Sequence, residues 1–112
     1  MAKDVVVEAI DDVSIAVQEN VDDQEDLLSE LARVRHERIE GVPLGEALGR
    51  ERRPRVVVVL DRIVNRLTLG SARLRRAFIT SLVEEGDTVT SVATRFEVTH
   101  QRISSILGRG RD

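Results

Sequence analysis

The chain has 112 residues, 41% of them hydrophobic, and a formal net charge of −3, which fits one ordinary domain or two very small ones. It contains no cysteine, so a disulfide framework and a thiolate metal site are both excluded. No N-terminal apolar run has the length of a signal peptide, and the longest apolar run, Val56 to Leu60, is far shorter than the ~20 residues that span a bilayer, so we expect a soluble, cytoplasmic protein.

The first predicted helix covers about Lys3 to Asn20. Its apolar residues recur at intervals of four, three and four, which places them on one face of a helix: Val6, Ile10, Val13 and Val17. The β-branched run Val5 to Val7 also suits a strand, but the longer period favours a helix.

A second helix is predicted from Asp22 or Asp23, either of which can cap its N-terminus, to about Glu40. Its apolar residues are Leu27, Leu28, Leu31 and Val34. Gly41 follows as a C-terminal stop.

Glycine and proline are frequent between residues 41 and 54, which predicts a loop with one short helix from Pro43 through Leu48. We expect a hinge at Arg50 to Arg55 and a third helix from Pro54 to Leu69. The apolar stripe of this helix comprises Val56, Val57, Leu60, Ile63, Val64 and Leu67. Val56 to Val59 would also suit a buried strand, but no second strand is evident to pair with it.

A fourth helix is predicted from about Ala72 to Glu85, after a break at Gly70 and Ser71. Gly86 ends this helix. The residues expected to face inward are Leu74, Ala77, Phe78, Ile79 and Leu82.

The segment from Asp87 to Gly108 predicts two short helices joined by a tight turn. Thr88 can cap a helix from Val89 to Phe96, and Thr99 can cap another from His100 to about Leu107. Small and apolar residues would lock these helices together: Val92, Ala93, Phe96, Val98, Ile103 and Ile106. Such a pair is typical of a helix-turn-helix. The predicted fold class is therefore all-α, a helical bundle of about five to six helices with a C-terminal helix-turn-helix.

The stretch from Gly86 to Arg109 resembles the helix-turn-helix (region 4-like) with which bacterial sigma factors read the upstream promoter element, and related regulator modules. The matching residues are Gly86, Thr88, Val92, Ala93, Arg95, Phe96, Val98, Thr99, Arg102, Ile103, Ile106 and Leu107. Glu97 departs from the pattern, because the family usually has Gly there, and a left-handed backbone costs another residue roughly 1 kcal/mol. The preceding helix, with Leu74, Arg75 and Arg76, also resembles the helix before this motif in that family, so the resemblance covers about 40 of the 112 residues. Nothing resembles the sigma-factor parts that melt DNA or bind the polymerase core, so we do not expect a true sigma factor.

This resemblance implies sequence-specific binding of double-stranded DNA by a bacterial transcription regulator associated with the nucleoid. The residues expected to read bases are His100, Gln101, Arg102, Ser104 and Ser105. Arg102 suits guanine and Gln101 suits adenine, since each can form two hydrogen bonds with that base. The residues expected to contact the DNA backbone are Thr88, Thr99, Arg73, Arg75, Arg76, Arg95, Arg109 and Arg111.

Each of these residues also has a purely structural interpretation. The two threonines cap helices whether or not DNA is present. Arg95 can be solvated, or it can pair with Glu84 or Glu85. The three arginines of the fourth helix would suit an ordinary charged helix face.

Charge is distributed unevenly along the chain. Residues 1–49 hold 13 acidic and four basic side chains, a net −9, whereas residues 50–112 hold seven acidic and 13 basic ones, a net +6. We therefore predict an acidic helical region for homodimerisation or partner binding at residues 1–53 and a basic DNA-binding domain at residues 54–112. The apolar residues of the first two helices are the candidate interface, although they would equally suit the core of a six-helix fold.

No catalytic set is apparent, and two histidines without cysteine make no common zinc site. We therefore expect neither enzymatic activity nor a metal or cofactor. A second hypothesis is a protein-interaction adaptor or anti-sigma-like factor that keeps the helix-turn-helix fold without binding DNA. Glu97 and the acidic composition suit an adaptor, whereas Arg102 and the basic C-terminal half favour a regulator.

Overall fold

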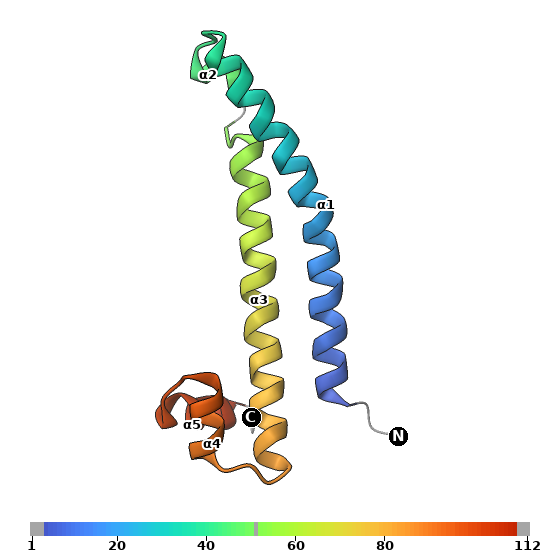
Figure 1. Cartoon of the computed structure of the whole chain (residues 1–112), viewed down its shortest axis with the longest axis vertical. Coiled ribbons are helices and arrows are strands. Elements are labelled where there is room, and N and C mark those ends of the chain that lie inside the picture. The colour runs from blue at the N-terminus through green and yellow to red at the C-terminus, as the bar shows by residue number, and fades with distance from the viewer. Residues whose placement is uncertain (1–3, 51, 110–112) are drawn as a thin grey trace. The chain divides into compact units, whose positions relative to one another are not determined.

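The computed structural model describes residues 4–50 and 52–109, and of Arg109 only the helical backbone. Within these ranges the chain forms five helices and no strand (Figure 1). The helices are α1 (Val5–Ile39), α2 (Leu44–Ala47), α3 (Arg55–Glu84), α4 (Val89–Phe96) and α5 (His100–Arg109). The predicted all-α fold class is confirmed.

Two predicted helix breaks are wrong. α1 continues through Asp22 and Asp23, which therefore cap no helix, and α3 continues through Gly70 and Ser71. Glycine inside a helix costs about 1 kcal/mol relative to alanine, but a Cβ at position 70 would lie 3.3 Å from Val13 Cγ2. Gly70 thus lets α1 and α3 approach closely instead of ending a helix.

The short helix α2 is the single turn that the sequence predicts after Pro43. The side chain of Arg33 in α1 donates a hydrogen bond of 2.9 Å to the carbonyl oxygen of Ala47. Ala47 is completely buried. This contact fixes α2 against the C-terminal part of α1.

Tertiary contacts divide the chain into two compact units. The terminal unit comprises residues 1–13 and 70–112, and the hairpin unit comprises residues 14–69. Both long helices take part in both units. The predicted regions, residues 1–53 and 54–112, were divided by charge, and they do not coincide with these two units. That division stays a prediction about function.

In the hairpin unit, α1 and α3 pack through a seam with coiled-coil spacing. The less exposed positions of α1 follow each other at intervals of three and four: Ala16, Asn20, Asp23, Leu27, Glu30 and Val34. On α3, Val56, Val59, Ile63 and Arg66 have the same spacing, and Val58 is a further half-buried residue outside this series. Alternating intervals of three and four keep a seam on one side of each helix. The rest of the predicted α3 stripe lies outside this seam, half-exposed: Val57, Leu60, Val64 and Leu67.

Asn20 is a buried polar residue in this seam, with 3% of its surface exposed. Its amide nitrogen donates to the carbonyl oxygen of Ile63 at 3.2 Å, and its amide oxygen accepts from Arg66 at 2.9 Å. A hydrogen bond of this kind contributes about 1 kcal/mol net, whereas a buried group left without a partner costs about 1–3 kcal/mol. Asn20 therefore favours one register of α1 against α3.

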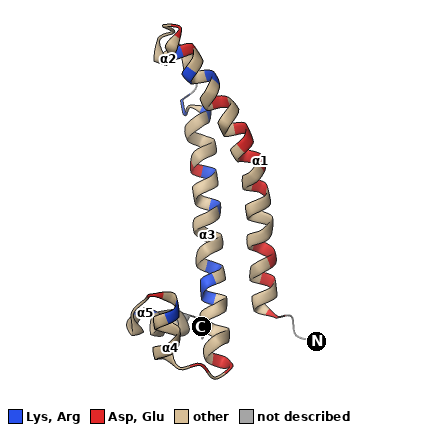
Figure 2. Ribbon diagram, viewed as in Figure 1, with Lys and Arg blue, Asp and Glu red and all other residues tan. Residues whose placement is uncertain are grey.

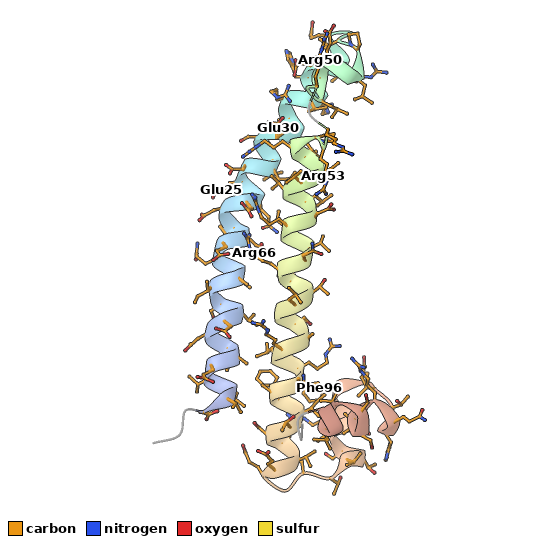
Figure 3. The ribbon with its side chains drawn as sticks, turned by 180° about the vertical axis from the view of Figure 1, so that it is seen from behind. Glu25, Glu30, Arg50, Arg53, Arg66 and Phe96 are labelled. Carbon is orange, nitrogen blue, oxygen red and sulfur yellow. The ribbon has the colours of Figure 1, made fainter. Side chains whose placement is uncertain are left out.

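Asp23 joins the two helices of the hairpin unit through ion pairs. Its carboxylate accepts hydrogen bonds from Arg62 at 2.9 Å and from Arg66 at 2.6 Å, and Figure 3 shows Arg66 pointing toward α1. These bonds, that of Arg62 first, lower the pKa of Asp23 to about 2. Further along α1, Asp26 lies 3.8 Å from Arg55, earlier in α3, so the helices run antiparallel. Acidic residues predominate on α1 and basic residues on α3 (Figure 2).

The core of the terminal unit is aliphatic and forms where the end of α3 meets α4 and α5. Its buried residues are Ile79, Val92, Ala93, Ile103 and Ile106. Half-buried residues pack around them: Leu82, Val83, Val89, Phe96, Val98 and Leu107. Every residue predicted to lock the last two helices together belongs to this core, so α4 and α5 are held by the contacts that the sequence pattern indicates.

Candidate nucleic-acid interface

Helix α4 begins at a hydrogen-bonded cap. Thr88 has extended backbone angles (φ −77°, ψ 154°), and its hydroxyl accepts a bond of 3.0 Å from the backbone N–H of Ser91. The predicted N-cap is confirmed, and a cap of this kind stabilises a helix by about 1 kcal/mol. The position of the first turn of α4 is therefore set by its own sequence.

The turn between α4 and α5 contains a strained residue. Glu97 has a left-handed backbone (φ 54°, ψ 43°), the conformation that the family pattern assigns to Gly. The N–H of Glu97 donates to the carbonyl of Thr94 at 3.3 Å, and the N–H of Val98 donates to that of Ala93 at 3.0 Å. These two bonds are the Schellman pattern of a helix C-terminus. The turn thus has left-handed geometry with glutamate rather than glycine at its first position.

Helix α5 begins directly after Thr99, whose hydroxyl accepts a bond of 3.0 Å from the N–H of Arg102. This predicted cap is also confirmed. Val98 before the cap and Ile103 in the first turn both belong to the core, at the positions of a hydrophobic staple. Cap and staple together fix the angle at which the chain enters α5.

The side of α5 that faces away from the core is polar. Ile103 is 0% and Ile106 is 6% exposed, whereas the five residues predicted to read bases are all exposed: His100, Gln101, Arg102, Ser104 and Ser105. Since successive residues of a helix turn by about 100°, Gln101 and Ser105 lie opposite the buried side. Arg102 and His100 lie at the two edges of the polar side, next to the buried residues. The centre of the candidate surface is therefore Gln101 and Ser105, with Arg102 beside them.

The three arginines of α3 that were predicted to contact DNA do not form one stripe, although all are exposed. Arg73 and Arg76 line a hollow in the terminal unit. The same hollow is lined by the acidic Glu8 and Asp12 of α1. Around the axis of α3, Arg75 is rotated by about 100° or more from Arg73 and Arg76. Of the three, Arg75 is the one on the side of α3 that packs against α4 and α5.

Arg95 on α4 pairs with Asp87, with Nη1 3.6 Å from Oδ2. The suggested pairing of Arg95 with Glu84 or Glu85 is therefore wrong. The Arg95 side chain is 61% exposed, and an ion pair between such exposed groups contributes at most about 1 kcal/mol. A phosphate group could compete with Asp87 for this arginine.

The remaining predicted backbone contacts are Thr88, Thr99, Arg109 and Arg111. Both threonines are exposed as well as capping. Arg109 belongs to α5, and Arg111 lies outside the described residues. In the part of the chain that the structure describes, no group of three or more histidine, aspartate and glutamate side chains could hold a metal ion.

Sequence reasoning missed an exposed apolar surface on the hairpin unit. It placed Val57, Leu60, Val64 and Leu67 in one apolar stripe with Val56 and Ile63, but each of the four is 43–52% exposed. The sequence could have indicated this surface, because the four residues are spaced by three, four and three and each directly follows a seam position of α3. A linear pattern merges two adjacent series into a single broad stripe, so only the packing of α1 on α3 separates them.

Comparisons of the chain with family models, with curated proteins and with solved structures gave no match. The resemblance to the promoter-reading helix-turn-helix of sigma factors therefore stays a prediction from the motif. Among residues 4–50 and 52–109, no helix combines the length and the apolar character that a membrane crossing requires.

Proposed function

We propose that the terminal unit binds double-stranded DNA through α5 and that the protein is a sequence-specific transcription regulator of a bacterial nucleoid. One observation carries the proposal: α5 buries Ile103 and Ile106 and leaves its opposite side polar and exposed. A short capped helix, a three-residue turn and a second capped helix are also what major-groove readers of this type use.

The polar side of α5 has the chemistry needed to distinguish bases. Arg102 can donate two hydrogen bonds to guanine, and Gln101 can form two with adenine, each worth about 1–3 kcal/mol of discrimination. Ser104 and Ser105 are short enough to allow close approach of the helix to base edges. Direct readout would therefore centre on Gln101 and Arg102.

Contacts to phosphates would come from the residues around this helix. The N-terminus of α4 offers backbone N–H groups and a favourable dipole, and Arg75 of α3 and Arg95 of α4 supply positive charge on the helices that share a core with α5. Each arginine that neutralises a phosphate adds about 1 to the slope of log affinity against log salt concentration. Affinity should therefore fall steeply with rising salt.

The experiment is a salt titration of binding to duplex DNA, combined with selection of preferred sequences from a random duplex pool. We expect Arg102→Ala to relax the preference at one base pair, and Arg75→Ala to weaken binding to all sequences alike. Arg35→Ala is the matched control, because Arg35 is an exposed arginine of the hairpin unit. It should leave both the preference and the salt slope unchanged.

The alternative function is that of an adaptor or anti-sigma-like protein that does not bind DNA. The acidic Glu97, exposed in the turn next to α5, favours this alternative because it would repel phosphates. Absence of binding even at low salt, with α5 intact by circular dichroism, would refute the regulator and leave the adaptor.

A further inference from the structure

The hairpin unit carries an exposed apolar face that its own packing does not use. On α1 this face consists of Val17, Val21, Leu28 and Leu31, and on α3 it consists of Val57, Leu60, Val64 and Leu67. Exposed fractions run from 42% at Val21 to 69% at Leu28. We call these eight residues the hairpin face.

The two stripes of the hairpin face lie on the same side of the unit. Each residue follows a position of the α1–α3 seam, as Val21 follows Asn20 and Val64 follows Ile63, so each stripe is turned by about 100° from the seam. Both helices are right-handed and they run antiparallel, so the same turn moves both stripes toward the same side. The stripes therefore form one continuous surface across α1 and α3.

The area of the hairpin face is that of an interface rather than of scattered surface residues. Its eight residues expose on the order of 700 Å², close to the ~800 Å² that each partner contributes to a standard interface. The largest apolar patch of an ordinary monomer is about 300–600 Å². Two helices alone leave most of their apolar side chains exposed to solvent. A four-helix bundle buries these side chains against a second pair of helices.

The arrangement of the hairpin face fits a two-fold axis. The α3 stripe has intervals of three, four and three, which read the same in both directions, and its centre lies at Arg62. In the α1 stripe, Val17 and Leu31 lie seven residues on either side of Gln24, and Val21 and Leu28 lie three residues before it and four after it, so this stripe is symmetric to within one residue. The Asp23–Arg62 ion pair places these two centres at the same level of the hairpin. A two-fold rotation about that level therefore sets apolar residues against apolar residues, as an interface between identical copies requires.

We propose that the hairpin face binds a second copy of this chain and that the two hairpin units close into an antiparallel four-helix bundle. The interface lies in residues 14–69 and includes α3, so it differs from the acidic region at residues 1–53 that charge alone indicates. The proposal stands without the DNA-binding function, although a dimer would also lengthen the DNA site that one helix-turn-helix can read.

Sedimentation equilibrium of the full chain, without DNA, tests this proposal. We expect twice the chain mass of 12.5 kDa. The double variant Leu28→Glu with Leu60→Glu should raise the dissociation constant by at least about 30-fold, the effect of a hot-spot residue. The matched control is Ile15→Glu with Leu69→Glu. These residues are exposed apolar side chains of the same helices, 59% and 63% exposed. Ile15 lies two residues before Val17 and Leu69 two residues after Leu67, a rotation of about 200°, so both point away from the hairpin face.

A cysteine cross-link gives a second readout that does not depend on folding energetics. Because the chain has no cysteine, Gln24→Cys introduces a single thiol at the centre of the hairpin face, and Leu69→Cys introduces one outside it. Under mild oxidation we expect a covalent dimer from Gln24→Cys and not from Leu69→Cys. A monomeric wild type, or equal disruption by the test and control variants, would overturn the dimer. A dimer that fails to bind DNA would refute the regulator alone, and a monomer that binds DNA would refute the dimer alone.

Discussion

Glu97 provides the sharpest test of the turn that orients α5. Its left-handed backbone (φ 54°, ψ 43°) costs a residue with a Cβ about 1–2 kcal/mol. Glycine avoids this cost but has more freedom to lose on folding, about 0.4–1 kcal/mol. We therefore expect Glu97→Gly to stabilise the terminal unit by about 0.5–1 kcal/mol, whereas Glu97→Ala removes the same charge and keeps the strain.

Comparing Glu97→Gly with Glu97→Ala separates the effect of backbone conformation on stability from the effect of removing the charge. At an ordinary helical position glycine is less stable than alanine by about 1 kcal/mol. At position 97 the order should be reversed. Ser104→Gly and Ser104→Ala supply the control, because Ser104 is exposed in the interior of α5 and should show the ordinary order.

The assay is urea denaturation followed by far-ultraviolet circular dichroism, since the chain has no tryptophan or tyrosine to report by fluorescence. Reversal of the glycine–alanine order at position 97, together with the ordinary order at position 104, supports the left-handed turn. If alanine is as stable as glycine at position 97, the turn does not have this conformation and the orientation inferred for α5 is wrong.

Two further predictions concern caps and charge. Thr88→Ala and Thr99→Ala should each destabilise the terminal unit by about 1 kcal/mol, because each hydroxyl accepts a backbone N–H, whereas Thr88→Ser and Thr99→Ser should retain most of the stability; equal loss in serine and alanine variants would contradict capping. The pKa of Asp23, lowered to about 2 by Arg62 and Arg66, lies below the value of about 4 in an unfolded chain. The ionised carboxylate therefore stabilises the fold above about pH 4, and this stabilisation is lost as the pH falls toward 2. Asp23→Asn should flatten the pH dependence of the urea midpoint in that range; an unchanged profile in Asp23→Asn would refute the assignment.

Local sequence determined the helical class and the details of the last two helices. Thr88 and Thr99 cap the helices that they were predicted to cap, and Glu97 has the left-handed backbone that glycine usually supplies at the end of a helix. These features depend on side chains and backbone groups within about five residues of each other, so a linear pattern contains the relevant physics. The polar side of α5 follows from the same helical period that buries Ile103 and Ile106.

Tertiary packing decided how long the helices between residues 5 and 84 are and which of their sides meet. Two breaks predicted at Asp22–Asp23 and at Gly70 are absent, because Asp23 is held by arginines of α3 and Gly70 provides space for Val13. The sequence likewise did not show which side of each long helix meets the other helix, since each helix has two adjacent rows of apolar residues. Only the contact of α1 with α3, through residues 43 apart in the chain such as Asn20 and Ile63, separates the seam from the hairpin face.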